Sequence, residues 1–394
     1  SAGYKWGIAS YSSRHAIANF GQDSSFAGTK TPQGNTDDNG VGDFYYAPPS
    51  GFLALTTGNL PAATITAPDE YFNTVLYTGT GSSQSITGTN FQPDWIWWKG
   101  RNASSSHLLM NAVVGNTKYL YSNSTAAEQT DGTNVLTSFD SDGFTLPADT
   151  GGYANFSGRT YVAWNWLAGN GTVSNTDGSI TSTVSANTDA GFSICSFTAS
   201  TSAYTFGHGL SEAPQAVFFK NRDRSSSWSV YHKDIGATKV LRLDTNAAAT
   251  TSGSWNNTAP TSTVVYNGAL YAEDCIAYCF HSVEGYSKIG SYTGNGSSDG
   301  TFVHCGFRPA FVMVKRTDAT SDWLAMDNKR ASYNFVDRWL NPNTSSAEST
   351  TASDFIDFTS NGFKWRYSGA NNASGGSYIF LAFAEAPFKS ANAR

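Results

Sequence analysis

The chain has 394 residues, more than one hydrophobic core usually serves, so several domains are expected. Charged and aromatic residues each make up 14% of it, and Gly, Ser, Thr and Asn crowd the stretches between apolar runs, which is typical of a turn-rich all-β protein. The net charge of -6 is spread without a basic block, which argues against nucleic acid as a partner, and no apolar run is long enough to span a membrane.

One pattern of residues occurs three times. Each copy opens with proline, closes with lysine six residues later and holds apolar residues between them; the copies are residues 93–99, 214–220 and 309–315. Proline is tolerated at the first position or the edge of a strand, so each copy is predicted to be a buried strand. Eight residues after each lysine come His107, Trp228 and Trp323. Matched motifs in matched order indicate one sandwich-sized unit used three times.

The fold class predicted from these patterns is all-β, a tandem array of antiparallel β-sandwich domains of a concanavalin or jelly-roll-like kind. The expected segments are a partial sandwich at 1–61, a linker at 62–70, repeat 1 at 71–169, an insertion at 170–190, repeat 2 at 191–284, repeat 3 at 285–388 and a tail at 389–394. Because almost no linker separates repeats 2 and 3, they are expected to form a stiff rod, with a hinge near the linker.

Two smaller interpretations accompany this prediction. The lysines that close the three strands, Lys99, Lys220 and Lys315, are interpreted as solvated strand ends. The four cysteines are too few for a disulfide framework, and we expect them to be buried free thiols.

The N-terminal region carries two motifs outside the repeat, Asn-Phe-Gly-Gln at 19–22 and Phe-Tyr-Tyr-Ala-Pro-Pro-Ser-Gly-Phe-Leu-Ala-Leu at 44–55. With them, residues 19–61 resemble the C-terminal end of the SPRY-like, concanavalin-type sandwich domains of bacteriophage tail-fibre and tail-appendage proteins, especially marine ones. The three repeats resemble the tandem β-rich modules of the same proteins, whose last unit often closes with a segment like 378–388. A SPRY-type sandwich needs more than 60 residues, so Ser1 is expected to lie inside a domain whose beginning is missing.

This resemblance implies a virion protein, a fibre or tail appendage that attaches to the host surface and is assembled in the host cytoplasm. The implied partner is a host cell-surface glycan or protein receptor, bound weakly and multivalently. The full-length parent is expected to be a homotrimer that contacts other virion proteins through its missing N-terminal part.

Two other functions remain open, a structural fibre spacer and a polysaccharide depolymerase. A depolymerase needs a pair of carboxylates held close together, and the acidic residues fall in turn-like contexts. The sequence also lacks the Gly-x-Ser-x-Gly motif of serine hydrolases. We therefore expect no enzymatic activity.

Four residues are candidate ligand contacts. Tyr153 and Trp255 stand outside any strand alternation, among glycine, serine and asparagine. Trp339 lies beside Arg338, ahead of an Asn-Pro-Asn turn. Loops on a rigid β scaffold often carry recognition, and an exposed ring near amide groups suits a sugar; packing over a small core is the alternative interpretation.

No cofactor is expected. An acidic loop, residues 37–43, places Asp37, Asp38 and Asp43 around Asn39-Gly40, and it is the best calcium candidate in the sequence. A plain solvated loop is the competing interpretation.

Overall fold

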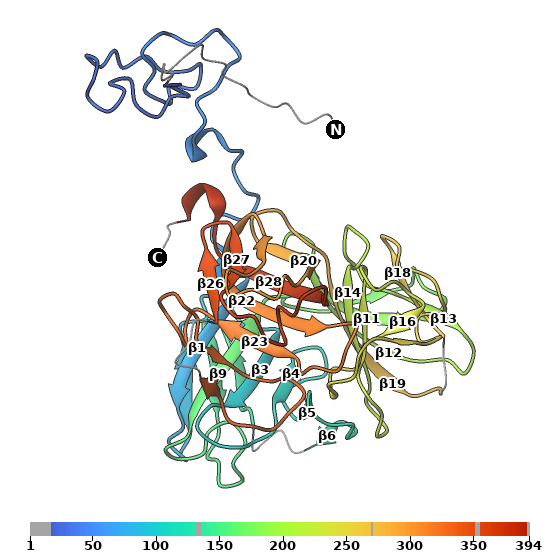
Figure 1. The fold of residues 1–394 in the computed structure, drawn as a ribbon. Helices are drawn as coiled ribbons and strands as arrows, with labels where there is room; N and C mark the ends of the chain where they lie inside the picture. The colour runs from blue at the N-terminus through green and yellow to red at the C-terminus, as the bar shows by residue number, and fades with distance from the viewer. Residues whose placement is uncertain (1–16, 131–134, 269–270, 351–354, 392–394) are drawn as a thin grey trace. The chain divides into compact units, whose positions relative to one another are not determined.

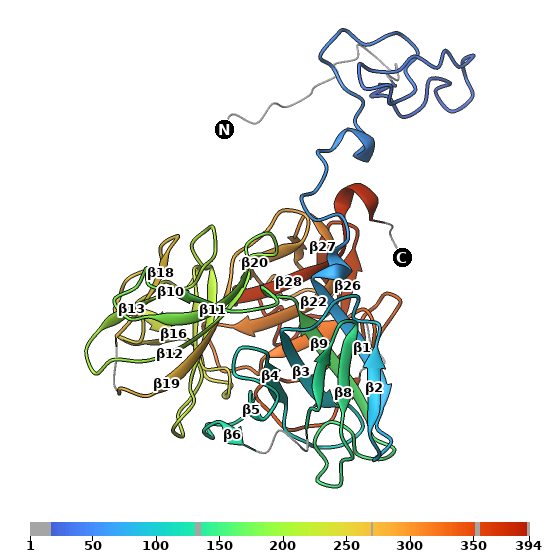
Figure 2. The same cartoon turned by 180° about the vertical axis from the view of Figure 1, so that it is seen from behind.

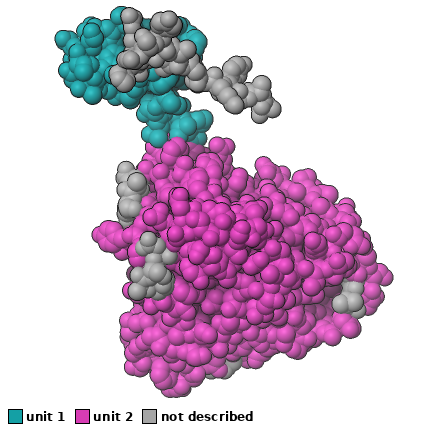
Figure 3. Space-filling model, viewed as in Figure 1, with its two compact units in different colours: residues 1–62 teal, residues 63–394 magenta. Residues whose placement is uncertain are grey.

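The computed structural model describes residues 17–130, 135–268, 271–350 and 355–391, and the chain divides into two compact units, residues 1–62 and 63–394 (Figure 3). In the described part of the first unit, the regular structure consists of the 3-10 helix η1 (Thr57–Asn59) and an isolated bridge between Asn35 and Phe44. Turns and side-chain hydrogen bonds organise the rest, and the SPRY resemblance stays a prediction.

Repeat 1 forms a six-stranded main sheet and a three-stranded smaller sheet, both antiparallel. The main sheet has the spatial order β1 (Phe72–Thr78), β9 (Thr160–Trp166), β3 (Trp95–Gly100), β4 (Leu108–Asn111), β5 (Lys118–Tyr121) and β6 (Gln129–Thr130). The smaller sheet contains β2 (Gln84–Thr87), β8 (Gly143–Leu146) and β7 (Ser138–Asp140).

Repeat 2 is built in the same way, and the inserted residues 170–190 add two strands to the edge of its main sheet. That sheet has the order β10 (Val173–Asn175), β11 (Ser182–Asn187), β12 (Phe192–Thr198), β19 (Asp274–Phe280), β14 (Ala216–Asn221) and β15 (Ser229–His232). Its smaller pairs are β13 (Tyr204–Gly207) with β18 (Val264–Asn267), and β16 (Lys239–Val240) with β17 (Thr250–Thr251).

Repeat 3 has a four-stranded main sheet in the order β20 (Ser287–Thr293), β28 (Ser377–Pro387), β22 (Phe307–Arg316) and β23 (Leu324–Asp327). Its smaller sheets join β21 (Phe302–His304), β27 (Gly362–Trp365) and β26 (Ile356–Thr359), and β24 (Arg338–Trp339) with β25 (Ser349–Thr350). Short 3-10 helices, η2 (Pro68–Glu70) and η4 (Phe388–Ser390), precede repeat 1 and follow repeat 3. No helix in the described ranges has the length and apolar character to cross a membrane. The all-β, antiparallel sandwich prediction is confirmed.

The central strands of each repeat bury both faces, because alternate residues enter two different cores. In β3, Ile96 and Trp98 point into a core between the main and smaller sheets of repeat 1. Trp95 and Trp97, on the other face, join a large core that contains residues of all three repeats. In β9, Val162 and Trp164 on one face and Tyr161 and Ala163 on the other are likewise buried.

The large core is shared by the three main sheets. Phe72 and Trp166 of repeat 1 contact Phe383 of repeat 3, with ring centroids 5.1 and 5.7 Å apart, and Trp95 stacks on Tyr278 of repeat 2 at 4.3 Å. Phe280 of repeat 2 contacts Phe383 at 6.0 Å, so each main sheet contacts the other two. The three sheets converge in Figures 1 and 2. The expected stiff rod of repeats 2 and 3 is therefore wrong, since all three repeats pack into one unit.

Polar joints link the repeats in a cycle. The indole nitrogen of Trp228 donates to the carbonyl of Tyr121 in repeat 1 at 2.9 Å, and that of Trp323 donates to the carbonyl of Arg242 in repeat 2 at 2.8 Å. In the third joint, His107 Nε2 lies 3.1 Å from the carbonyl of Asn341 in repeat 3. The residue eight places after each lysine is thus a buried contact with the preceding repeat of the cycle.

The three lysines belong to the same joints. Lys99, Lys220 and Lys315 are 1%, 0% and 0% exposed, so their interpretation as solvated strand ends is wrong. Lys220 donates to the carbonyl of Thr125 in repeat 1 at 2.9 Å and to that of Ser226, and Lys315 donates to the carbonyl of Asn246 in repeat 2 at 3.2 Å. Burial lowers the pKa of each lysine to about 8. The ammonium groups donate hydrogen bonds to backbone carbonyls where two repeats meet.

The linker, the cysteines and the C-terminal tail were also predicted from the sequence. Residues 63–70 belong to the second unit, and Ile65 is buried in the shared core at 2% exposed. All four cysteines are free and buried, which confirms their prediction. The tail expected at 389–394 is described as far as residue 391.

The shared core predicts that a single repeat does not fold alone. Residues 170–284 expressed separately would expose the face that carries Phe218, Trp228 and Phe280, and large apolar faces drive association or unfolding. We expect the fragment to be aggregated or unfolded by sedimentation and amide hydrogen exchange, while residues 63–394 unfold in one transition. A folded, monomeric fragment would contradict the shared core.

Removing a joint lysine should destabilise the second unit. Lys220→Ala leaves a void and two carbonyls without their donor, so we expect the free energy of unfolding in urea to fall by about 2–4 kcal/mol. The matched control is Lys239→Ala, because Lys239 is exposed. Equal stability of the two variants would show that the joint lysines contribute nothing.

Candidate functional site

Two of the sequence-predicted ligand contacts lie in packed surroundings. Trp255 is 1% exposed in the core of repeat 2, where its ring contacts Tyr231 edge-on at 5.7 Å, so the exposed ring expected there is not found. Tyr153 is half-buried in repeat 1 and contacts Tyr119 with ring centroids 6.0 Å apart. These two residues are in different repeats and do not form one site.

The other two predicted contacts are neighbours in repeat 3 with different surroundings. Arg338 forms ion pairs with Asp337 at 3.5 Å and with Glu348 at 3.7 Å. Trp339 stacks on Phe355 at 4.6 Å and lines a cavity of about 270 Å³. Of the four candidates, Trp339 borders an open space that a ligand could enter.

The acidic loop of the first unit uses its carboxylates to hold its own backbone. Asp37 accepts hydrogen bonds from the amides of Ala54, Val41 and Asn39 and from the side chain of Asn59. Burial raises the pKa of Asp37, but these hydrogen bonds outweigh it and lower the pKa to about 2. The described residues contain no group of three or more acidic, histidine or cysteine side chains placed to hold a metal ion.

The two other calcium candidates are also engaged. Asp38 accepts hydrogen bonds from the amide of Gly51 at 2.8 Å and the hydroxyl of Ser50 at 2.9 Å, and Asp43 accepts one from the amide of Ser24 at 3.0 Å. Both carboxylates thus hydrogen-bond to backbone amide or hydroxyl groups of the same unit.

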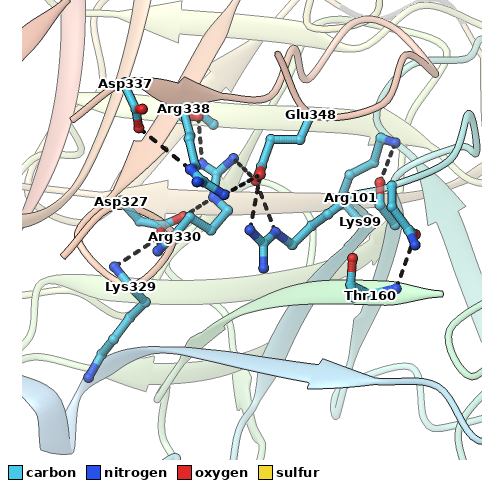
Figure 4. Close-up of polar contacts among 12 residues, drawn as sticks. Lys99, Arg101, Thr160, Asp327, Lys329, Arg330, Asp337, Arg338 and Glu348 are labelled. Carbon is cyan, nitrogen blue, oxygen red and sulfur yellow. Dashed lines mark hydrogen bonds and ion pairs between the residues drawn. The ribbon is translucent and has the colours of Figure 1, made fainter. Parts of the chain in front are cut away.

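A dense charged cluster lies in the joint between repeats 1 and 3 (Figure 4). Arg101 binds the carboxylate of Glu348 through two hydrogen bonds of 3.0 Å each, and Arg330 reaches the same carboxylate at 3.1 Å. Arg330 also pairs with Asp327 at 2.6 Å. Since the side chains of Arg330 and Glu348 are 0% and 8% exposed, the cluster is enclosed, and its geometry joins two repeats.

An equivalent pair closes the joint between repeats 1 and 2. Arg222 binds Glu128 through hydrogen bonds of 2.7 and 2.9 Å. Burial opposes the charged form of Arg222, but Glu128 raises its pKa above the ordinary value. The third joint has Thr317 and Ala249 at these places and keeps the backbone hydrogen bond from Ala249 to Thr317 at 2.9 Å. The charged pair is therefore an addition to a joint that also forms without it.

A cavity with a volume of about 610 Å³ lies in repeat 2. This is in the size range of small-molecule sites. The lining combines hydroxyl, amide, aromatic and guanidinium groups, supplied by Ala199, Tyr204, Phe219, Asn221, Arg224, Ser226, Ser227, Ser229, Arg242, Ser252, Gly253, Ser254, Asn267, Gly268, Tyr271 and Cys275. Such a lining presents hydrogen-bonding groups beside aromatic rings.

Arg242 and Arg224 are the charged residues that line this cavity. Arg242 donates to Ser229 Oγ at 2.6 Å, and no carboxylate lies within ion-pair distance of it among the described residues. The guanidinium carbon of Arg224 lies 3.6 Å from the ring centroid of Tyr271, and its Nε lies 3.9 Å from a carboxylate oxygen of Glu273. The cavity is thus positively charged in a chain whose net charge is negative.

The cavity of repeat 3 occupies the equivalent place. Ser226 and Ser321 each donate a backbone hydrogen bond across a joint, and each lines the cavity of its own repeat. Asn341 takes the place of Arg242, and the rings of Trp339 and Tyr367 line the smaller space. In repeat 1 the equivalent residue is Tyr121, whose ring contacts Tyr119 at 5.4 Å.

Sequence reasoning missed Arg242 because arginine next to a short strand usually indicates a solvated position. A signal was present: the equivalent positions in the other repeats hold Tyr121 and Asn341, so the cation is particular to repeat 2. Ser252 and Ser254, just before Trp255, line the cavity, whereas the Trp255 ring is buried in the core of repeat 2.

The charged joint can be tested against its uncharged counterpart. Glu128→Ala leaves Arg222 buried without its carboxylate, and we expect the free energy of unfolding to fall by about 3–5 kcal/mol. Adding Arg222→Thr reproduces the third joint and should recover much of that loss, as measured in urea. Exposed Glu284→Ala is the matched control. Strictly additive losses in the double variant would contradict this account.

Comparison with known proteins gives one family. A family model described as "Domain of unknown function (DUF7483)" matches residues 67–387, which span the three repeats and begin and end inside the second unit. A search of curated proteins found no match. Because the model covers most of the chain, the chain belongs to the DUF7483 family.

Proposed function

We propose that the protein is a non-enzymatic recognition component of a phage fibre or tail appendage, and that it binds a host-surface glycan in the cavity of repeat 2. The observation that carries the proposal is the lining of this cavity, where five serines and two asparagines surround the rings of Tyr204, Phe219 and Tyr271. Hydroxyl and amide groups match the polar edge of a sugar, and rings match its apolar face.

The body around the cavity supports recognition. Main sheets that bury both faces and share one core hold the lining loops on a rigid scaffold, which is where binding residues usually lie. The described lining of the cavity contains no Asp or Glu, so the two carboxylates of a glycosidase are not supplied at this place. These features favour binding over hydrolysis at the cavity.

The attachment setting rests on the resemblance of the sequence to phage tail proteins. A single open sugar site binds weakly, with a dissociation constant of about 1 mM, or about -4 kcal/mol. Presentation of several copies, as in a homotrimeric parent, would raise the apparent affinity by roughly 10² to 10⁴ without a new contact. Weak, multivalent binding therefore fits both the cavity and the proposed location in a virion.

A cavity-filling variant tests the site. A Cβ atom at Gly253 would meet no heavy atom within 4 Å, so Gly253→Trp should fold and occlude the cavity; we expect it to lose glycan binding on a bead-displayed glycan array. Gly171→Trp is the matched control, because a Cβ there also meets nothing within 4 Å and the residue does not line the cavity.

The same experiment also tests the two other functions, a structural spacer and a depolymerase. A structural spacer would show no glycan binding by the unmodified chain. A depolymerase would release reducing ends from host-surface polysaccharide in a parallel assay. Binding that Gly253→Trp leaves intact would place recognition outside this cavity and contradict the proposed site.

A further inference from the structure

The cavity of repeat 2 is lined by a guanidinium that the joint between repeats 2 and 3 does not use. Arg242 contributes to the joint with repeat 3 through its backbone carbonyl, which accepts the hydrogen bond from Trp323. The backbone carbonyls of Tyr121 and Asn341 accept the equivalent hydrogen bonds in the other two joints. Because a tyrosine and an asparagine serve equally in that place, the joint does not require an arginine side chain.

The surroundings of Arg242 are those of a partly buried cation without a close anion. Its described hydrogen bond goes to a neutral hydroxyl, Ser229 Oγ, at 2.6 Å. Burial lowers the pKa of Arg242, and Asp244 offsets this effect in part from beyond ion-pair distance. The carboxylate of Asp244 accepts a hydrogen bond from the amide of Trp228 at 2.8 Å.

Other arginines in similar surroundings have a carboxylate partner. Arg101, Arg222 and Arg330 each bind Glu128 or Glu348 at 3.1 Å or less. A guanidinium has a planar fork of donors that matches a carboxylate, and a desolvated cation gains most from such a partner. Arg242 lines the cavity, so a ligand bound there is placed to supply this partner.

We infer that the cavity recognises an acidic saccharide, a uronic or sialic acid, whose carboxylate binds Arg242 while its hydroxyl groups contact the serines and amides of the lining. This inference rests on the proposed glycan-binding function and names its ligand class. Arg224 stands at the same cavity but shares its charge with Glu273 at 3.9 Å. One unpaired cation fits the single charge of a carboxylate better than the double charge of a phosphate.

The test compares acidic glycans with their neutral forms. An array carries uronic-acid-terminated and sialic-acid-terminated oligosaccharides, each beside its carboxyl-reduced derivative, and is probed with the full chain. We expect the acidic member to bind at least about tenfold more strongly, as charge-assisted hydrogen bonds contribute at this level, and the preference to shrink as salt rises.

Arg242→Asn places in repeat 2 the residue that repeat 3 has at the equivalent position, so its carbonyl keeps the joint. This variant should lose the acid preference of about tenfold or more and retain binding to the neutral derivatives. The matched control is Arg366→Asn, which changes the net charge equally at a half-exposed position in repeat 3 where Arg366 pairs with Asp357 at 3.5 Å. It should keep the preference. Urea unfolding of each variant checks that the fold is intact.

The outcomes separate the two proposals. If acidic and reduced glycans bind equally, or if Arg242→Asn keeps the preference, the acidic-sugar inference is wrong and the glycan-binding proposal stands. If phosphorylated or sulfated glycans displace the uronic and sialic acids, the ligand class is wrong. If no glycan binds the unmodified chain, the proposed function fails and this inference fails with it.

Discussion

Burial of both faces of three antiparallel main sheets is the constraint on which the second unit depends. A sheet with two apolar faces needs a partner on each, and in every repeat a smaller sheet or the residues around it cover one of them. The other face is covered by the main sheets of the two remaining repeats. Aromatic residues fill this shared core because they cover much area at few positions and pair edge-on or offset, as Trp97 and Trp164 do at 5.8 Å.

Packing three sheets around one core brings backbone polar groups together at the joints, and buried carbonyls need donors. Trp228, Trp323 and the joint lysines supply these donors, and the carbonyls that accept from them belong to the preceding repeat of the cycle. The cycle of joints is more regular in its backbone and indole contacts than in its charged pairs, which two of the three joints have. Apolar burial and carbonyl satisfaction are thus the common requirement, and the ion pairs are additions that differ between joints.

The same repetition makes differences between repeats informative. A position that serves the joint through its carbonyl accepts different side chains, so the residue there can vary with local function. Repeat 1 places aromatic rings around Tyr121, repeat 3 forms a smaller cavity beside Asn341, and repeat 2 opens the larger cavity with Arg242. A threefold scaffold therefore has one common core and three distinct outer surfaces.

The sequence by itself determined the all-β class, the three repeats and the strands that form their centres, because proline, lysine and apolar alternation are local features. It also singled out Trp339 as a candidate contact, and in the structure this residue lines a cavity. Only the tertiary structure decided that the repeats share a core. An apolar strand has the same sequence pattern whether its second face packs against its own repeat or against another one. The tertiary structure also decided the role of Lys220 and Arg242. Lysine and arginine are usually exposed, and one of the carbonyls that accept a hydrogen bond from Lys220 belongs to Thr125, 95 positions away in the chain.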